Sequence, residues 1–210
     1  MKKILLSIVT IISFSFLSQA QFKVGIKAGS SLDNQRINVT EGSVYGSDNF
    51  KGYYAGLTGD MNIGGNFYLQ PQLLYNRKEA THLSSIGEKD IKIRMSYVEL
   101  PVNVLYKADL SFGKVFAGAG ATFSYAVAGK EKQGGMTRKL YSGAVKDWRR
   151  EDLSLNFTAG LEFNNGIFVS VNSQKGLLDI HKDDRISVKN KSVSLSVGYL
   201  IDWNKFKRKV

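Results

Sequence analysis

The sequence predicts an all-β protein: an eight-stranded antiparallel up-and-down transmembrane β-barrel with long extracellular loops and short periplasmic turns. Three observations predict this fold class. Apolar and polar residues alternate with period two in eight segments, the connections between these segments alternate between long and short, and the first 20 residues have the composition of an export signal.

The composition excludes several classes of function. The 210 residues carry 29 Lys and Arg against 18 Asp and Glu, which gives a formal net charge of +11. This length suits one domain or two small ones. The chain has no Cys and only 2 His. It therefore has no disulfide, no zinc finger, no iron–sulfur cluster and no cysteine nucleophile, and little material for a histidine-rich metal site.

The N-terminus has the three parts of a secretory signal peptide. Lys2 and Lys3 are followed by an uncharged, mostly apolar run from Ile4 to Ser18, and Ala20 ends the small residues that a signal peptidase needs. A membrane anchor is the alternative, but the run is short for a span of about 20 residues. We expect a signal peptide at 1–20, an outer-membrane β-barrel domain at 21–203 and a basic C-terminal tail at 204–210.

Nothing after the signal has the length of a membrane-spanning helix. The longest uncharged stretch is Met61–Asn76, and Asn-Ile-Gly-Gly interrupts it. A spanning helix requires roughly 18 apolar residues. An all-α membrane protein is therefore excluded.

Eight segments alternate between a face of apolar residues and a face of mainly small or polar ones, as a strand with two different environments does. In the first, Phe22, Val24 and Ile26 alternate with Lys23 and Gly25. The apolar faces of the eight predicted strands are, in order, Phe22, Val24, Ile26, Ala28; Tyr53, Ala55, Leu57, Met61; Phe67, Leu69, Leu73, Tyr75; Val98, Leu100, Val102, Val104, Tyr106; Val115, Ala117, Ala119, Ala121, Phe123, Tyr125; Leu153, Leu155, Phe157, Ala159, Leu161, Phe163; Ile167, Val169, Val171; and Val193, Leu195, Val197, Tyr199, Ile201.

The connections alternate in length, as they do in an up-and-down barrel whose long loops all lie at one rim. Asn165-Gly166 is a favourable hairpin dipeptide within one of the short turns. The predicted long connections are 30–51, 78–90, 129–152 and 176–191, and the predicted short turns are 62–65, 107–111 and 164–166. An additional pair of strands within 129–152 remains an alternative.

A soluble β-barrel or sandwich would also alternate, but with a different polar face. Here the face opposite the large apolar residues is small and uncharged over long stretches, for example Ser154, Asn156, Thr158 and Gly160. Such residues suit a cramped, hydrogen-bonded interior better than a solvated surface. The membrane barrel is therefore favoured.

The end of the chain resembles the last-strand signal that the barrel-assembly machinery reads. Ser196 to Trp203 follows the spacing polar-x-Gly-x-x-apolar-x-aromatic, and Trp203 would lie at the membrane interface. Such barrels often end on the aromatic residue, whereas this chain continues through a tail with Lys205, Lys207 and Arg208.

Several motifs resemble a known family. They are the Gln-Ala-Gln that ends the signal, the opening Phe22–Gly29, the segment Ser96–Val102 (Ser-Tyr-Val-Glu-Leu-Pro-Val) and Phe116–Gly120 (Phe-Ala-Gly-Ala-Gly). They resemble the porin-family outer-membrane β-barrel proteins often called PorT-like, over essentially the whole mature chain. The resemblance implies fold and location, not an activity.

Some charged residues are predicted to face inward, where opposite charges can pair across a narrow lumen. Such residues form either a structural plug or a charged constriction that selects ions. Arg94 precedes a phase shift that we expect near Ser96. The inward set is Lys23, Lys27, Asp60, Arg94, Glu99 and Glu162.

The third long connection is basic, which indicates either a solvated loop or contact with anionic lipopolysaccharide. Its charged residues are Lys130, Lys132, Arg138, Lys139, Lys146, Arg149 and Arg150 against Glu131, Asp147, Glu151 and Asp152.

Both histidines, His82 and His181, fall in predicted long loops close to serines and aspartates. No G-x-S-x-G or comparable context accompanies them. We therefore predict no enzyme, no cofactor, and no catalytic, cofactor-binding or metal-binding residues. The residues near the histidines are Ser84, Ser85, Asp90, Asp179, Asp183 and Asp184.

The predicted protein is an integral protein of the cell outer membrane with a structural or surface-interaction role. An accessory role in a protein-secretion apparatus, which the PorT-like name implies, and a narrow pore are the alternatives. Predicted partners are outer-membrane lipid, with lipopolysaccharide as a candidate, and the barrel-assembly machinery during biogenesis. The predicted export of the chain argues against nucleic acid.

Overall fold

The computed structural model describes residues 22–39, 44–45, 49–82, 91–133, 135–141, 149–178 and 186–202. Among these residues, no helix is long and apolar enough to cross a membrane. The predicted signal peptide, Trp203 and the basic tail lie outside the described residues, so those predictions stand as made.

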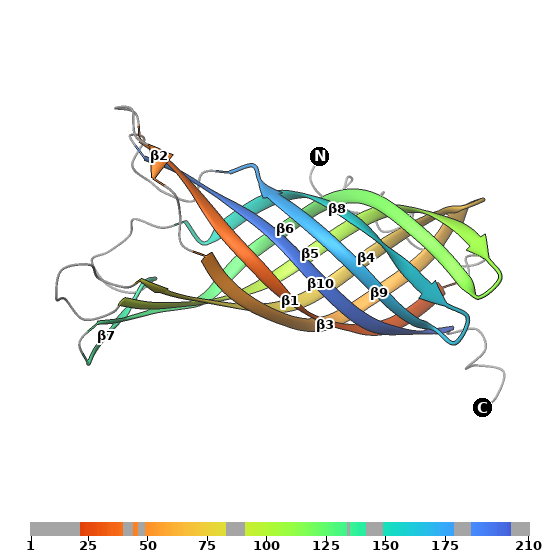
Figure 1. The fold of residues 1–210 in the computed structure, drawn as a ribbon, viewed down its shortest axis with the longest axis horizontal. Helices are drawn as coiled ribbons and strands as arrows, with labels where there is room; N and C mark the ends of the chain where they lie inside the picture. Colours follow the sequence, from red (N-terminus) through yellow and green to blue (C-terminus); the bar gives the residue numbers. More distant parts are fainter. Residues whose placement is uncertain are drawn as a thin grey trace, which may run out of the picture.

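Eight long antiparallel strands form one closed sheet (Figure 1), because the last strand also pairs with the first. Two short strands extend it at the end away from the tight turns. The strands are β1 (Phe22–Val39), β2 (Val44–Tyr45), β3 (Asn49–Gly64), β4 (Phe67–His82), β5 (Ile91–Leu110), β6 (Gly113–Gln133), β7 (Met136–Lys139), β8 (Glu151–Phe163), β9 (Ile167–Gly176) and β10 (Ile186–Asp202).

The register fixes the geometry of the barrel. Cross-strand partners followed once around from Phe22 return to β1 at Leu32, ten residues further along the strand. For eight strands about 4.8 Å apart, a ten-residue stagger corresponds to a strand tilt of about 40°. Lys23 pairs with Asp202, so both ends of the described chain lie at the rim that carries the tight turns.

The alternation of long and short connections is confirmed, but the strands are longer than predicted. Each strand continues past the apolar segment into the predicted long connection, for example β4 to His82 and β6 to Gln133. The end of β6 forms a hairpin with β7, so the third long connection does contain an extra strand. Gly166 takes a φ of 91° in the β8–β9 turn, a conformation that favours glycine.

One predicted turn was wrong at its start. Residues 107–111 were expected to connect two strands, yet β5 runs on to Leu110 and only Ser111 and Phe112 precede β6. Lys107 is consequently a strand residue that faces inward and is buried. The end of this strand was predicted from the apolar alternation, which stops before Lys107-Ala108-Asp109.

The predicted lipid-facing residues face outward and the alternating residues face inward. Ile26 is 63% exposed and Phe157 is 59% exposed, whereas Asp60 and Thr122 are 0% exposed. This pattern is the reverse of a soluble protein, in which large apolar side chains are buried. Lipid is the solvent that covers such an apolar surface, so the fold is a transmembrane barrel and not a soluble one.

Small residues make room for aromatic rings inside the barrel. A Cβ on Gly198 would lie 2.3 Å from Cζ of Phe168, so only glycine allows that ring to lie against β10. The glycine of the C-terminal motif therefore has a packing role in the lumen.

Arg94 does not face inward as predicted. The register irregularity near Ser96 places its extra residue, Val127, on β6, so β5 keeps its alternation without a phase shift. Arg94 pairs with Glu79 of β4 on the outward face, and its side chain is 40% exposed.

Candidate functional site: the charged lumen and the outer rim

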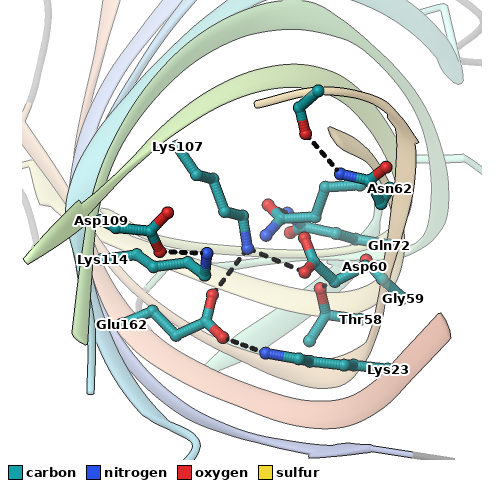
Figure 2. A network of polar contacts seen from close by, with 12 residues as sticks. Lys23, Thr58, Gly59, Asp60, Asn62, Gln72, Lys107, Asp109, Lys114 and Glu162 are labelled. Atoms are coloured by element: carbon teal, nitrogen blue, oxygen red, sulfur yellow. Dashed lines mark hydrogen bonds and ion pairs between the residues drawn. The ribbon is translucent and has the colours of Figure 1, made fainter. Parts of the chain in front are cut away.

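The lumen near the tight turns is filled by a network of four charged side chains (Figure 2). Lys107 of β5 donates to Asp60 Oδ2 of β3 at 2.8 Å and to Glu162 Oε2 of β8 at 2.6 Å. The other oxygen of Glu162 accepts a hydrogen bond from Lys23 of β1 at 2.6 Å. Alternation turns all four side chains inward from four different strands, and the register brings them to one level.

This network, here called the basal plug, is electrically balanced, with two cations and two carboxylates. Exposure is 1% for the side chains of Lys107 and Asp60 and 3% for Glu162. The Lys107 ammonium also lies 4.6 Å from the ring centroid of Tyr68 and 5.7 Å from that of Phe116. Buried charges persist when they are paired and hydrogen-bonded in this way.

A layer of neutral polar groups fills the middle of the lumen around one buried lysine. Lys27 donates to Gln72 and to Asn172, each at 3.3 Å. Thr158 donates to the same Asn172 oxygen at 2.9 Å, and Tyr54 donates to Ser194 at 3.2 Å. These bonds join the strands through the interior.

A second charged network lies further toward the long-loop rim. Lys78 donates to Asp33 Oδ1 at 2.7 Å, and Ser31 donates to the other oxygen of Asp33 at 2.6 Å. Asn76 donates to Glu99 at 3.1 Å. Thus the lumen contains ion pairs at two levels with amides and hydroxyls between them.

Two small cavities remain among these layers. One, of about 30 Å³, is lined by groups that include Lys27, Gln72 and Glu99. The other, of about 10 Å³, lies beside Lys78 and Tyr97. The first holds about two water molecules and the second about one at most.

An apolar cluster covers the lumen beneath the β6–β7 hairpin. Met95, Tyr97 and Ala126 are buried together with Leu140, which follows β7. Arg150 holds this segment, because it donates to the backbone oxygen of Tyr141 at 2.9 Å and to that of Ala126 at 3.1 Å. The chain after β7 is thereby fixed to the top of β5 and β6.

The predictions for inward charges are confirmed at five positions and wrong at Arg94. The five that face the lumen are Lys23, Lys27, Asp60, Glu99 and Glu162. Three partners were missed. Asp33 and Lys78 lie in segments predicted as loops, and Lys107 was assigned to a turn. Continued alternation past the apolar segments is the signal that would have found them.

Of the residues from which a hydrolytic set could be assembled, the described part of the structure includes only His82. His82 ends β4, whereas His181 and the nearby serines and aspartates lie outside the described residues. Within the described residues, no group of three or more His, Cys, Asp or Glu side chains could hold a metal ion.

At the long-loop rim, Glu79 lies among cations on the face turned away from the lumen. It accepts hydrogen bonds from Arg94 and, at 3.3 Å, from Arg77, and Lys92 lies 3.8 Å away. Partial desolvation acts to raise the pKa of Glu79, but the Arg94 hydrogen bond and the charges of Arg94, Lys92 and Arg77 lower it below its usual value. The single carboxylate of Glu79 therefore lies close to three positively charged side chains.

The closed sheet, the apolar exterior and the paired polar interior define a transmembrane β-barrel of the outer-membrane class. The chain belongs to the family of the outer membrane protein beta-barrel domain, whose model matches residues 17–182. The protein is therefore an outer-membrane β-barrel protein, and its location is the outer membrane.

Solved structures of the same fold are only distantly similar in sequence. OprG from Pseudomonas aeruginosa is 10% identical, with a TM-score of 0.50 and coverage of 85% of this chain and 95% of that one. Neisserial surface protein A (NspA) is 14% identical, with a TM-score of 0.48 and coverage of 87% and 99%. Ail of Yersinia pestis, in complex with the heparin analogue sucrose octasulfate, is 15% identical, with a TM-score of 0.46 and coverage of 86% and 99%.

No curated protein matches the sequence. At these identities the structural likeness concerns the fold alone, and the PorT-like name remains a prediction.

Proposed function

We propose that this protein is a sealed outer-membrane barrel with a structural or surface-interaction role, which acts through its outer rim and neither conducts solutes nor catalyses a reaction. The observation that carries the proposal is the basal plug, in which Lys107 links carboxylates from two other strands across the lumen. Eight strands enclose an interior that side chains nearly fill.

The energetics of the lumen support a seal rather than a gate. A solute that crossed the basal plug would have to separate Lys107 from Asp60 and Glu162, and breaking a buried pair costs about 3–5 kcal/mol. Further along the lumen, the Lys78–Asp33 pair at 2.7 Å presents a second barrier. A pore would need both layers to open together.

The orientation completes the proposal. A signal peptide at 1–20 would export the chain, and the mature protein would begin at Gln21 with both ends in the periplasm. The rim with β2 and β7 would then face outward from the cell. A secretion-apparatus role rests only on the PorT-like resemblance.

Electrical recording in planar lipid bilayers tests the seal. The wild-type protein is expected to give no stable single-channel openings. The variant Asp33→Ala/Asp60→Ala/Lys78→Ala/Lys107→Ala/Glu162→Ala removes charged groups from both barriers, and it should conduct ions. The plug does not seal the lumen if the wild-type protein shows stable single-channel openings and the variant has no higher conductance.

A further inference from the structure

The outward surface beyond the lipid-facing belt carries a concentration of cations that the proposed role does not explain. Each of these side chains faces away from the lumen and is exposed or half-buried. We call this set the basic collar: Lys51, Arg77, Lys92, Arg94, Lys130, Lys132, Lys139, Lys175 and Lys191.

The collar begins where the apolar belt ends. On β4 the outward residue after Tyr75 is Arg77, and on β3 the outward residue beyond Tyr53 is Lys51. Arg77 lies 5.9 Å from the ring centroid of Tyr53. Aromatic side chains mark the level of lipid headgroups, so the first collar residues lie at headgroup depth.

Cations are direct neighbours on adjacent strands of the collar. Arg94 of β5 pairs with Lys130 of β6, which pairs in turn with Lys139 of β7. Two residues further along, Lys92 pairs with Lys132. Neighbouring strands lie about 4.8 Å apart, and like charges that lie directly opposite destabilise a sheet.

The same arrangement recurs on the other side of the barrel, where Lys175 of β9 pairs with Lys191 of β10. Among the residues whose side chains the structure describes, Glu79 and Glu151 add carboxylates to this outward surface. Glu79 compensates Arg77, Lys92 and Arg94 in part. The positive charge that remains on neighbouring strands favours a multivalent anion as the binding partner.

The opposite rim is different. Among the described residues near the tight turns, the outward face carries aliphatic and aromatic side chains such as Phe67, Tyr106 and Tyr199. The charged residues there include Asp109 and Lys114, which form an ion pair with each other. Within the described residues, the excess of outward-facing positive charge therefore lies at the long-loop rim.

We propose that the basic collar binds the phosphate groups of lipopolysaccharide in the outer leaflet of the membrane that surrounds the barrel. The collar adjoins the lipid-facing surface, so membrane-bound anions reach it more readily than a soluble polyanion does. Lipopolysaccharide supplies phosphates at this depth, on the side where the collar lies. This inference rests on the orientation in the proposed function.

Binding of diphosphoryl lipid A tests the collar. The full-length mature protein in zwitterionic detergent micelles is titrated with this lipid, and the bound fraction is measured by native mass spectrometry. The variant Lys130→Gln/Lys132→Gln/Lys139→Gln removes three exposed cations from the β6–β7 hairpin. Each cation near an anionic headgroup contributes about fivefold in affinity, so binding should weaken on the order of 100-fold. Added salt should also weaken wild-type binding.

Control variants distinguish the loss of charge from a change in side-chain shape and from a failure to fold. Thr137→Gln alters the same exposed hairpin without a change of charge and should bind like the wild type. Lys175→Gln/Lys191→Gln removes a cation pair on other strands and should weaken binding as well. Slower gel migration after boiling shows that each variant forms the folded barrel.

Two results with lipid A would overturn the inference: equal affinity for dephosphorylated lipid A, or unchanged affinity in both lysine variants. Binding of heparin without binding of lipid A would also overturn it, in favour of a soluble polyanion. Conductance is recorded on the same preparations. A conducting protein that still binds lipid A through its phosphates would contradict the sealed lumen and leave the collar intact.

Discussion

Replacement of Lys107 by methionine tests the physical account of the barrel interior most directly. Methionine is similar in length and removes the charge from the centre of the basal plug. Lys107 is the closest cation to Asp60, at 2.8 Å, and it shares Glu162 with Lys23. Among the described residues, Asp60 Oδ1 has no hydrogen-bond partner, so the carboxylate depends on the hydrogen bond that its other oxygen accepts.

The loss of unfolding free energy depends on which ion pairs each carboxylate keeps in the variant. After Lys107→Met, Glu162 keeps Lys23 at 2.6 Å, and the buried Asp60 loses its hydrogen-bonded cation, because its cross-strand neighbour Lys23 is already bound to Glu162. A buried charge that loses its partner costs about 3–5 kcal/mol. Lys23→Met should cost about 1 kcal/mol, because Lys23 is 25% exposed and Glu162 keeps Lys107.

Urea unfolding in lipid vesicles measures these free energies, and an unchanged dependence on urea shows that the same surface is exposed in each variant. Asp60→Asn/Lys107→Met should recover a large part of the loss, since no unpaired carboxylate then remains on β3. If Lys107→Met and Lys23→Met are equally mild, or if the double variant is worse than Lys107→Met, the plug does not stabilise the barrel through paired charge.

Three further predictions concern the membrane and the topology. The mature protein should migrate differently on a gel before and after boiling in detergent, whereas recovery wholly in the soluble periplasmic fraction would contradict a membrane barrel. A tag inserted after Gly134 should be labelled on intact cells and one after Asn165 should not; the reverse would mean an inverted topology. Single arginine substitutions at 155, 157, 159, 161 and 163 should be most destabilising in the middle of the strand, where Ala159→Arg should cost about 2–4 kcal/mol. Thr158→Arg tests the inward face. Urea unfolding in vesicles checks this, and a flat profile would show that the face does not meet lipid.

The sequence predicted which way most side chains of the barrel point, because each face of a strand meets one environment. On β8, Phe157 meets lipid and Asn156 meets the lumen, so the two residues differ sharply in polarity. Strand number and the alternation of connections followed from the same pattern. These properties are local, and a period of two is enough to find them.

The partners in the lumen could not be predicted, because they depend on register and not on alternation. Lys23 and Glu162 are 139 residues apart in sequence and meet only after the barrel closes with its ten-residue stagger. The ends of the strands were missed for another reason. Beyond the belt both faces become polar, so the environment no longer distinguishes the two sides, and Lys78 was read as loop.

The collar was missed for the same reason. Lys130, Lys132 and Lys139 were counted within one basic loop, but only the register places Arg94 and Lys92 of β5 beside them. A charge count cannot tell a solvated loop from a surface that spans several strands.

Alternation and ion pairing specify different parts of this fold, and together they account for a unique barrel. A slip of one residue between strands would turn every lipid-facing side chain inward, so the apolar pattern excludes it. A slip of two residues keeps all faces correct and costs the belt little. It would, however, move Lys107 by about 7 Å along β5 relative to Asp60 and Glu162, which separates the buried pairs. The charged lumen therefore disfavours the register errors that the apolar pattern tolerates. On this reasoning the basal plug selects the stagger of the barrel as it fills the lumen, and the stagger in turn sets which cations become neighbours in the collar.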